Sequence, residues 1–141
     1  MAVKEKALRR LADKLNAAGV TWAAGGEWVL CQAGLLDTYH VFDIYVAEAD
    51  IAAADRALTR LGMRSEVPSE DAFRAEYHFD GADIHVRAGI PGFAFDAGCV
   101  SGDTTVLGAS VHLLSGEAGA RLGDKYAAQW QELARRQSEG A

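Results

Sequence analysis

The stretch VFDIYV, residues 41–46, combines strand-forming residues with one carboxylate, Asp43. The stretch ADIHV, residues 82–86, repeats the pattern around Asp83. Because side chains alternate along a strand, each segment predicts one apolar face and an opposite face that carries the carboxylate. If the two strands are neighbours, Asp43 and Asp83 converge on one open face of the sheet. The alternative is that both faces are half-buried and each carboxylate meets water or a salt bridge.

The predicted convergence of the two carboxylates has a chemical consequence. Two carboxylates held close together repel each other, which raises the pKa of one of them unless a cation lies between them. Magnesium, bound by carboxylate and phosphate oxygens, is the usual cation in such sites. A transition-metal site that adds His40 and His85 to the two carboxylates is a further alternative. Arg87 is predicted to pair with Asp83 or to meet a phosphate.

Gly25 and Gly26 follow a predicted short strand and open a predicted helix. Free backbone N–H groups at such a start, with no Cβ in the way, can hold a phosphate. A Gly-Gly pair that makes only a turn is the alternative. The glycine pair, the Asp43 strand and the Asp83 strand together form a constellation that favours a phosphate site.

The order of predicted elements defines the fold class. An Asp-Gly pair between two strand-like runs is typical of a hairpin turn, because both central residues can take positive φ. The pattern predicts an α+β fold, a mixed sheet with helices packed on it, as a single domain over residues 1–141. The expected helices are 3–18, 27–34, 51–61 with Asp50 as a cap, and 116–136 capped by Ser115, and the expected strands are 20–24, 40–46, 73–79, 82–88 and one or two within 104–114.

Composition excludes some classes of function. The chain has 141 residues and a net charge of −6, which argues against generic nucleic-acid binding but leaves a local basic patch open. No apolar run approaches the roughly 20 residues of a membrane span, so no membrane association is expected. The N-terminus is charged throughout and has no apolar signal core. The default expectation is a cytoplasmic protein.

The stretch GGEWVLCQAGLLDTYHVFDIYVAEADIAAADRAL, residues 25–58, resembles the core of the nucleotidyltransferase superfamily, which has the polymerase-beta-like fold. That superfamily has Gly-Gly or Gly-Ser at a helix start, a strand with Asp-x-Asp, a helix, and a third Asp on a later strand. GADIHV, residues 81–86, is similar to the third-Asp strand of small antibiotic nucleotidyltransferases. Residues 109–133 resemble the closing strand and final helix of minimal nucleotidyltransferase domains. The resemblance covers roughly residues 5–135.

The resemblance implies roles for particular residues. It implies that Asp43 and Asp83 are catalytic and bind Mg²⁺, as the second and third Asp of the superfamily. It also implies a nucleoside triphosphate or other small-molecule ligand, and a helical protein partner or a homodimer. The implied nucleotide-binding residues are Gly25, Gly26 and Lys125. Apart from the resemblance, His40, His85 and Arg87 are candidate accessory residues because of their positions near the two carboxylates in the sequence.

One departure from the superfamily pattern decides the functional prediction. The first Asp of the pair is expected at position 41, where this chain has Val41, and moving the alignment places Tyr45 at the second position instead. Neither side chain replaces a charged bidentate oxygen ligand. Glu27, just after the glycines, is expected to repel a triphosphate.

We therefore expect a catalytically degenerate protein that binds a nucleotide, another small phosphate-bearing ligand or a protein partner. The alternative is an active magnesium-dependent enzyme that transfers a nucleoside monophosphate to a hydroxyl group of a small molecule or protein.

Overall fold

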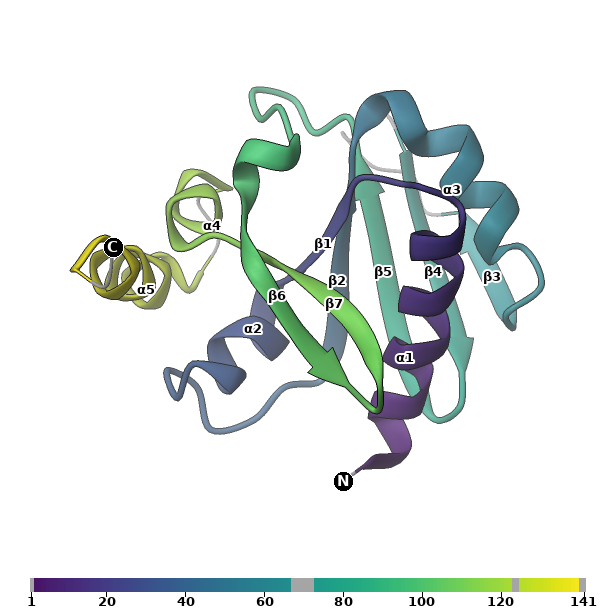
Figure 1. Cartoon of the computed structure of the whole chain (residues 1–141), viewed down its shortest axis with the longest axis horizontal. Coiled ribbons are helices and arrows are strands. Elements are labelled where there is room, and N and C mark those ends of the chain that lie inside the picture. The colour runs from purple at the N-terminus through teal and green to yellow at the C-terminus, as the bar shows by residue number, and fades with distance from the viewer. Residues whose placement is uncertain (1, 67–72, 123–124, 140–141) are drawn as a thin grey trace.

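The computed structural model of the chain describes residues 2–66, 73–122 and 125–139. In this part of the chain the strands form one seven-stranded sheet in the order β3-β4-β5-β2-β1-β7-β6 (Figure 1). The strands are β1 (Trp22–Gly25), β2 (Val41–Val46), β3 (Met63–Glu66), β4 (Phe73–Phe79), β5 (Ala82–Ala88), β6 (Val100–Val106) and β7 (Ala109–Leu114). The helices are α1 (Ala2–Ala17), α2 (Gly26–Gln32), α3 (Ile51–Leu58), α4 (Gly116–Leu122) and α5 (Ala127–Glu139), with short 3-10 helices at Glu48–Asp50 and Ala97–Cys99.

The sheet is mixed, which confirms the predicted α+β class. β2 pairs in parallel with β5 and β1 in parallel with β7, whereas the other neighbouring strands are antiparallel. The two strands that carry Asp43 and Asp83 are therefore neighbours, which is the condition under which the sequence predicts a shared face for the two carboxylates. Figure 1 shows α4 and α5 beside the β6 end of the sheet, away from β3.

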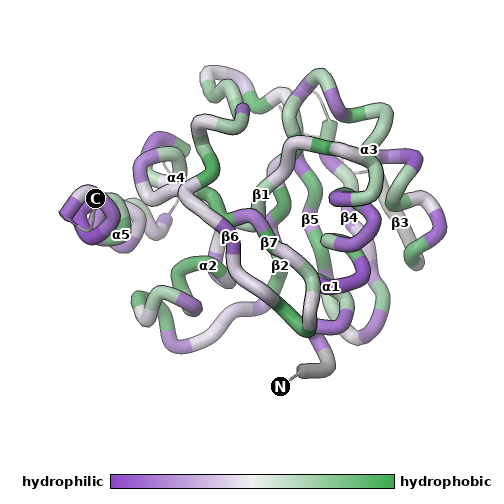
Figure 2. Tube along the Cα trace, in the orientation of Figure 1, coloured by the Kyte–Doolittle hydropathy of each residue, from purple (hydrophilic) through white to green (hydrophobic). Residues whose placement is uncertain are grey.

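One face of the sheet is apolar and is covered by helices. Phe42, Ile44 and Ile84 are almost fully buried on this face, where Trp28 of α2 packs edge-on against Phe42. α1 contributes buried leucines to the same core and contacts α3 beside it. Figure 2 shows hydrophobic stretches along the central strands of the sheet. In the described part of the chain no helix is both long and apolar enough to cross a bilayer.

The β4–β5 hairpin confirms the turn prediction. Asp80 and Gly81 both have positive φ, 51° and 75°. Asp80 accepts this conformation because a short polar side chain tolerates the left-handed region better than most. The hairpin sets the register of β5 and therefore the position of Asp83 next to His78 on β4.

The structure differs from the sequence prediction at three places. Asp50 precedes α3, but its side chain makes no cap hydrogen bond to that helix and instead accepts the Thr21 N–H at 3.0 Å. The strand β3 was not predicted, because MRSE lacks an alternating apolar pattern. The predicted helix over 116–136 is two helices, α4 and α5, with residues 123 and 124 outside the described residues. Ser115 does cap α4, since its hydroxyl accepts the Ala118 N–H at 3.1 Å.

Two glycines let α5 fold back against α4. A Cβ on Gly119 would lie 2.1 Å from the Trp130 ring, and a Cβ on Gly116 would lie 2.3 Å from the backbone nitrogen of Ala134. Trp130 is only 1% exposed, so this close approach buries a large apolar side chain. The buried contact explains why one continuous helical pattern gives two packed helices.

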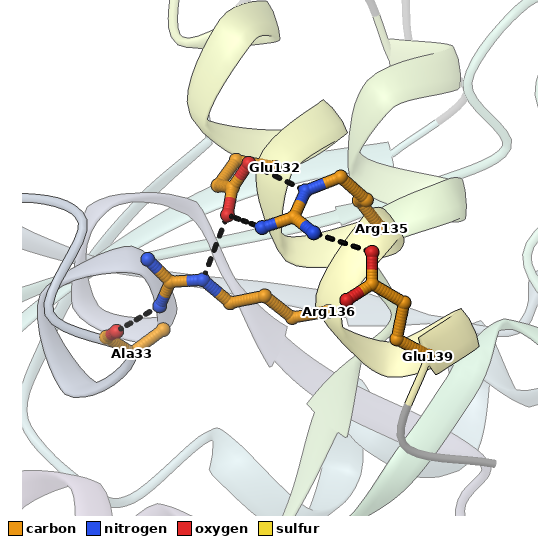
Figure 3. Close-up of polar contacts among 5 residues, drawn as sticks. All are labelled: Ala33, Glu132, Arg135, Arg136 and Glu139. Carbon is orange, nitrogen blue, oxygen red and sulfur yellow. Dashed lines mark hydrogen bonds and ion pairs between the residues drawn. The ribbon is translucent and has the colours of Figure 1, made fainter.

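A charged network fixes the outer part of α5 (Figure 3). Arg135 bonds to Glu132 and Glu139 on the same helix, and Arg136 also bonds to Glu132. The hydrogen bonds from Arg135, and to a lesser extent those from Arg136, lower the pKa of the Glu132 carboxyl to about 2. Arg136 donates in addition to the Ala33 carbonyl at 3.1 Å, which ties α5 to the end of α2.

Replacing Gly119 with alanine tests the α4–α5 contact. Helix propensity alone predicts that Gly119→Ala gains about 1 kcal/mol. We expect the opposite sign, a loss of about 1–3 kcal/mol in the free energy of unfolding, because the new methyl group displaces the Trp130 ring. Denaturant unfolding measures the difference. Glu117→Ala, at an exposed position of the same helix, is the control and should change stability by about 0.5 kcal/mol or less. A stabilised Gly119→Ala protein would contradict the packing.

Candidate functional site

The open face of the sheet carries the polar side chains of β2 and β5. The parallel register places Val41 opposite Asp83 and Asp43 opposite His85. Side chains at paired positions point to the same face, so both carboxylates lie on the face opposite the helices α1 and α3. Sequence alternation predicted this shared face for the case in which the two strands are neighbours.

A cavity of about 620 Å³ opens on this face, within the usual volume range of small-ligand sites. Its walls come from the start of α2, the strands β2 and β5, and the turn before α5. We call it the Asp43 cavity. The residues that line it are Gly26, Glu27, His40, Val41, Asp43, Tyr45, Arg87, Lys125 and Tyr126.

Asp43 lies directly against the first residue of α2. Gly26 has a φ of 61°, and a Cβ there would lie 2.0 Å from Oδ2 of Asp43. Only glycine combines this backbone conformation with room for the carboxylate. Gly25, in contrast, is part of β1, and a Cβ there would meet the Tyr45 ring at 2.7 Å. Of the two glycines, Gly26 lines the cavity and Gly25 permits close packing behind it.

Glu27 joins three segments around the cavity. Its Oε1 accepts the His40 N–H at 2.9 Å, and its Oε2 accepts the Tyr126 hydroxyl proton at 3.0 Å. Burial opposes ionisation of Glu27, but these hydrogen bonds and the nearby His40 ring outweigh it and hold the pKa of its carboxyl below the usual 4.5. The sequence predicted Glu27 only as a charge that repels phosphate. Its role as a link, and Tyr126 as its partner, were missed, because the two residues are 99 positions apart in the chain.

Two cations line the cavity beside these carboxylates. The Arg87 guanidinium carbon lies 5.9 Å from the Tyr45 ring centroid, and the Lys125 Nζ lies 5.0 Å from the Tyr126 ring centroid. The aromatic rings favour these cation positions through their negative faces. The lining of the cavity therefore includes both cationic and anionic side chains.

Asp83 and His85 lie on the same face but are not among the residues that line the cavity. Asp83 bonds to His78 Nδ1 at 2.5 Å, and its side chain is 58% exposed. His85 stands between Asp43 and Glu76, with its ring nitrogens 3.9 Å and 3.6 Å from their carboxylate oxygens. The structure brings Gly26, His40, Asp43, Arg87 and Lys125 together and leaves Asp83 and His85 beside them along the sheet.

The donor set decides whether a metal ion fits. In the described residues no group of three or more histidine, cysteine, aspartate or glutamate side chains is arranged to hold a metal ion. Val41, opposite Asp83, lines the cavity with hydrocarbon where a carboxylate oxygen would be needed. Glu27 is engaged by His40 and Tyr126. These residues do not fit the two-ion magnesium site that the resemblance implies, and they do not assemble the transition-metal alternative.

Comparison with known proteins identifies the fold. A scan against protein-family models finds no match, and a search of curated proteins finds no significant match. Among solved structures, the chain is similar to a Thermotoga maritima protein described as a candidate nucleotidyltransferase, with 18% identity, a TM-score of 0.65, and 96% of this chain and 92% of that chain covered. It is also similar to ANT(2")-Ia in complex with adenylyl-2"-tobramycin, with 13% identity, a TM-score of 0.66, and coverage of 96% and 88%. The lincosamide antibiotic adenylyltransferase LnuA, bound to lincomycin, gives 16% identity, a TM-score of 0.64, and coverage of 93% and 98%. The chain therefore has the nucleotidyltransferase fold, which confirms the resemblance at the level of the fold.

Gly26→Ala tests the contact between the start of α2 and Asp43. We expect a loss of about 1–3 kcal/mol in the free energy of unfolding, because a strained backbone and a displaced carboxylate act together. Gly34→Ala is the matched control, since Gly34 has a φ of 77° but a Cβ there would meet no atom within 4 Å. Chemical denaturation gives the free energy of unfolding of both variants. The loss in Gly34→Ala reports backbone strain alone, and the additional loss in Gly26→Ala reports the contact with Asp43. Adding Asp43→Ala should restore stability to Gly26→Ala but not to Gly34→Ala, and equal effects in both would contradict the contact.

Glu27→Gln tests the link between α2 and Tyr126 through its pH dependence. At pH 7 we expect a loss of about 1 kcal/mol, because a neutral amide accepts these hydrogen bonds less well. The folded pKa of Glu27 is lowered, so its stabilising contribution is full above 4.5 and is lost as the pH falls through the folded pKa. The stability difference between wild type and Glu27→Gln should therefore shrink below pH 4.5. Thermal unfolding between about pH 3 and 7 measures it, with the exposed Glu117→Gln as control, and a difference that grows on acidification would contradict the link.

Proposed function

We propose that the Asp43 cavity binds a nucleotide or another small phosphate-bearing ligand, and that the protein is catalytically degenerate. The observation that carries this proposal is the composition of the cavity, which is lined by Arg87, Lys125 and Val41 among others. The first two residues supply charge for a phosphate. The third removes a metal ligand from the place where the superfamily pattern has a carboxylate.

Ligand binding rests on the two cations and on the shape of the site. Arginine offers a planar set of donors that matches two phosphate oxygens, and lysine supplies a compact positive charge. Glu27 already accepts hydrogen bonds from His40 and Tyr126, so its two oxygens are engaged with protein donors. This arrangement lowers the repulsion that an unpaired glutamate would exert on a phosphate. Asp43 can accept a hydrogen bond from a sugar hydroxyl or a base N–H group of the ligand.

Loss of catalysis rests on the missing oxygen ligand. Two-ion transfer of a nucleotidyl group needs carboxylates that hold both metal ions in line with the attacking and leaving oxygens. Val41 supplies no donor, and the Asp83 carboxylate is engaged by His78. The residues present therefore support a binding site without magnesium-dependent transfer. In this proposal Asp43 and Asp83, the predicted catalytic pair, have no joint role in transfer.

A binding measurement with a matched variant tests the proposal. Wild-type protein titrated with each nucleoside triphosphate in a calorimeter should show saturable binding of at least one of them. Lys125→Gln should weaken that binding about tenfold, because it removes one charge-assisted phosphate contact. Lys6→Gln, an exposed change on α1, is the control and should leave the affinity unchanged.

The same samples test the degenerate character of the site. With magnesium and a nucleoside triphosphate, we expect no release of pyrophosphate above the protein-free rate across a panel of hydroxyl acceptors. An affinity for nucleotide that is the same in wild type and in Lys125→Gln, or the absence of binding of any nucleotide, would contradict the proposed ligand. Release of pyrophosphate that Asp43→Asn abolishes would contradict the loss of catalysis.

A further inference from the structure

A second cavity lies on the opposite side of the sheet, between α1 and α3. Its volume is about 730 Å³. We call it the basic groove. The residues that line it are Arg10, Lys14, Ala17, Ala18, Arg56, Ala57, Thr59, Arg60 and Leu61. Arg10 packs over the ring of Phe79, at 5.3 Å from its centroid, and Phe79 belongs to the apolar face, so the groove and the Asp43 cavity lie on different sides of the sheet.

The charge of the groove is opposite to the charge of the chain. Four of its nine lining residues are arginine or lysine and none is aspartate or glutamate, whereas the chain as a whole has 14 basic and 20 acidic residues. Random scatter of charges in an acidic protein favours mixed linings. A concentration of one sign in a concave site is the arrangement that focuses a field on a charged ligand.

The cations of the groove come from both of the segments that border it. Arg10 and Lys14 are four residues apart on α1, and residues at this spacing are neighbours on a helix surface, so these two like charges repel each other. Arg56 lies in the last turn of α3 and Arg60 lies two residues beyond the end of that helix, and both line the same cavity. The helix dipole favours cations in the last turn, which accounts for Lys14 and Arg56. It does not account for two pairs that border one cavity.

Most of this charge is not neutralised within the protein. Arg10 forms an ion pair with Asp80 at 2.8 Å, and this bond together with Phe79 fixes its guanidinium at the rim. Among the described residues no ion pair involves Lys14, Arg56 or Arg60, and all three are exposed. A multivalent anion in the groove would relieve the repulsion among these cations.

We propose that the basic groove binds a small multivalent anion of the oligophosphate class, independently of the Asp43 cavity. Arginine predominates in the groove, and its planar donor set matches phosphate oxygens in pairs. The volume admits a compound of a few phosphate groups. A long nucleic acid would extend beyond the groove over a surface of net negative charge, and its affinity depends on many phosphate contacts that this surface does not provide.

Titration with inorganic tripolyphosphate tests the proposal. Wild-type protein at low ionic strength should bind tripolyphosphate in a saturable way, and the affinity should fall as salt is added. The double variant Arg56→Gln/Arg60→Gln should weaken binding about tenfold or more, since two charged donors are lost. Both residues are exposed, so the variant should keep the wild-type circular dichroism and melting temperature. Lys4→Gln, an exposed change over the Tyr39 ring and outside the lining of both cavities, is the matched control and should leave tripolyphosphate affinity unchanged. Lys125→Gln shows whether the anion binds in the Asp43 cavity instead of the groove.

Several results would overturn the proposal. They are absence of tripolyphosphate binding, binding that the double variant does not weaken, and binding that Lys125→Gln removes instead. The last result would place the anion in the Asp43 cavity. A single-stranded oligonucleotide or an acidic peptide that binds more tightly than tripolyphosphate, with the same dependence on Arg56 and Arg60, would assign the groove to a polymer and overturn the small-anion proposal.

Discussion

The parallel pairing of β2 with β5 is the constraint on which the rest of the site depends. Its register puts Asp43 opposite His85 and Val41 opposite Asp83. Because side chains alternate with a period of two, a shift by one residue would turn Phe42 and Ile44 outward and bury Asp43. Burial of Phe42 and Ile44 under the helices therefore fixes the open position of the carboxylates. The apolar core and the polar site are two consequences of one register.

Contacts between distant segments then shape the Asp43 cavity. Gly26 allows the Asp43 carboxylate to lie against the start of α2, and Glu27 joins that helix to His40 and Tyr126. The fold-back of α5 onto α4 through Gly119 holds the C-terminal part of the chain that carries Tyr126 and Lys125. Each of these contacts depends on a glycine without a Cβ or on a carboxylate with two donors, so substitutions far from the cavity alter its walls.

Much of the fold could be predicted from the sequence, because it depends on local patterns. Alternation around Asp43 and Asp83 predicted two strands with a shared polar face, and Asp80 with Gly81 predicted the hairpin between β4 and β5. The Gly-Gly pair predicted a helix start, which α2 provides. These features follow from side-chain direction and backbone freedom within a few residues, and they indicated the α+β class. The nucleotidyltransferase fold was indicated by the resemblance of residues 25–58, 81–86 and 109–133 to that superfamily.

The details of the site were less predictable, because they depend on partners far away in the chain. Nothing near Glu27 indicates that Tyr126 will bond to it, and nothing near Asp83 distinguishes His78 from a metal ion as its partner. The break between α4 and α5 follows from the contact of Gly119 with Trp130, which a helical period does not reveal. The basic groove is lined by cations of α1 and of the α3 region, which are far apart along the chain. The composition allowed a local basic patch but gave no position for it, and only the structure shows where these cations come together.

The central proposal is that the Asp43 cavity binds a phosphate-bearing ligand without a metal ion. Amide chemical shifts of isotope-labelled protein, recorded during a nucleoside triphosphate titration with EDTA present, test it most directly. The account predicts saturable shifts at Gly26, Glu27 and Lys125, with the same dissociation constant when magnesium replaces EDTA. Shifts that require magnesium, or a titration that leaves these three residues unshifted, would contradict it.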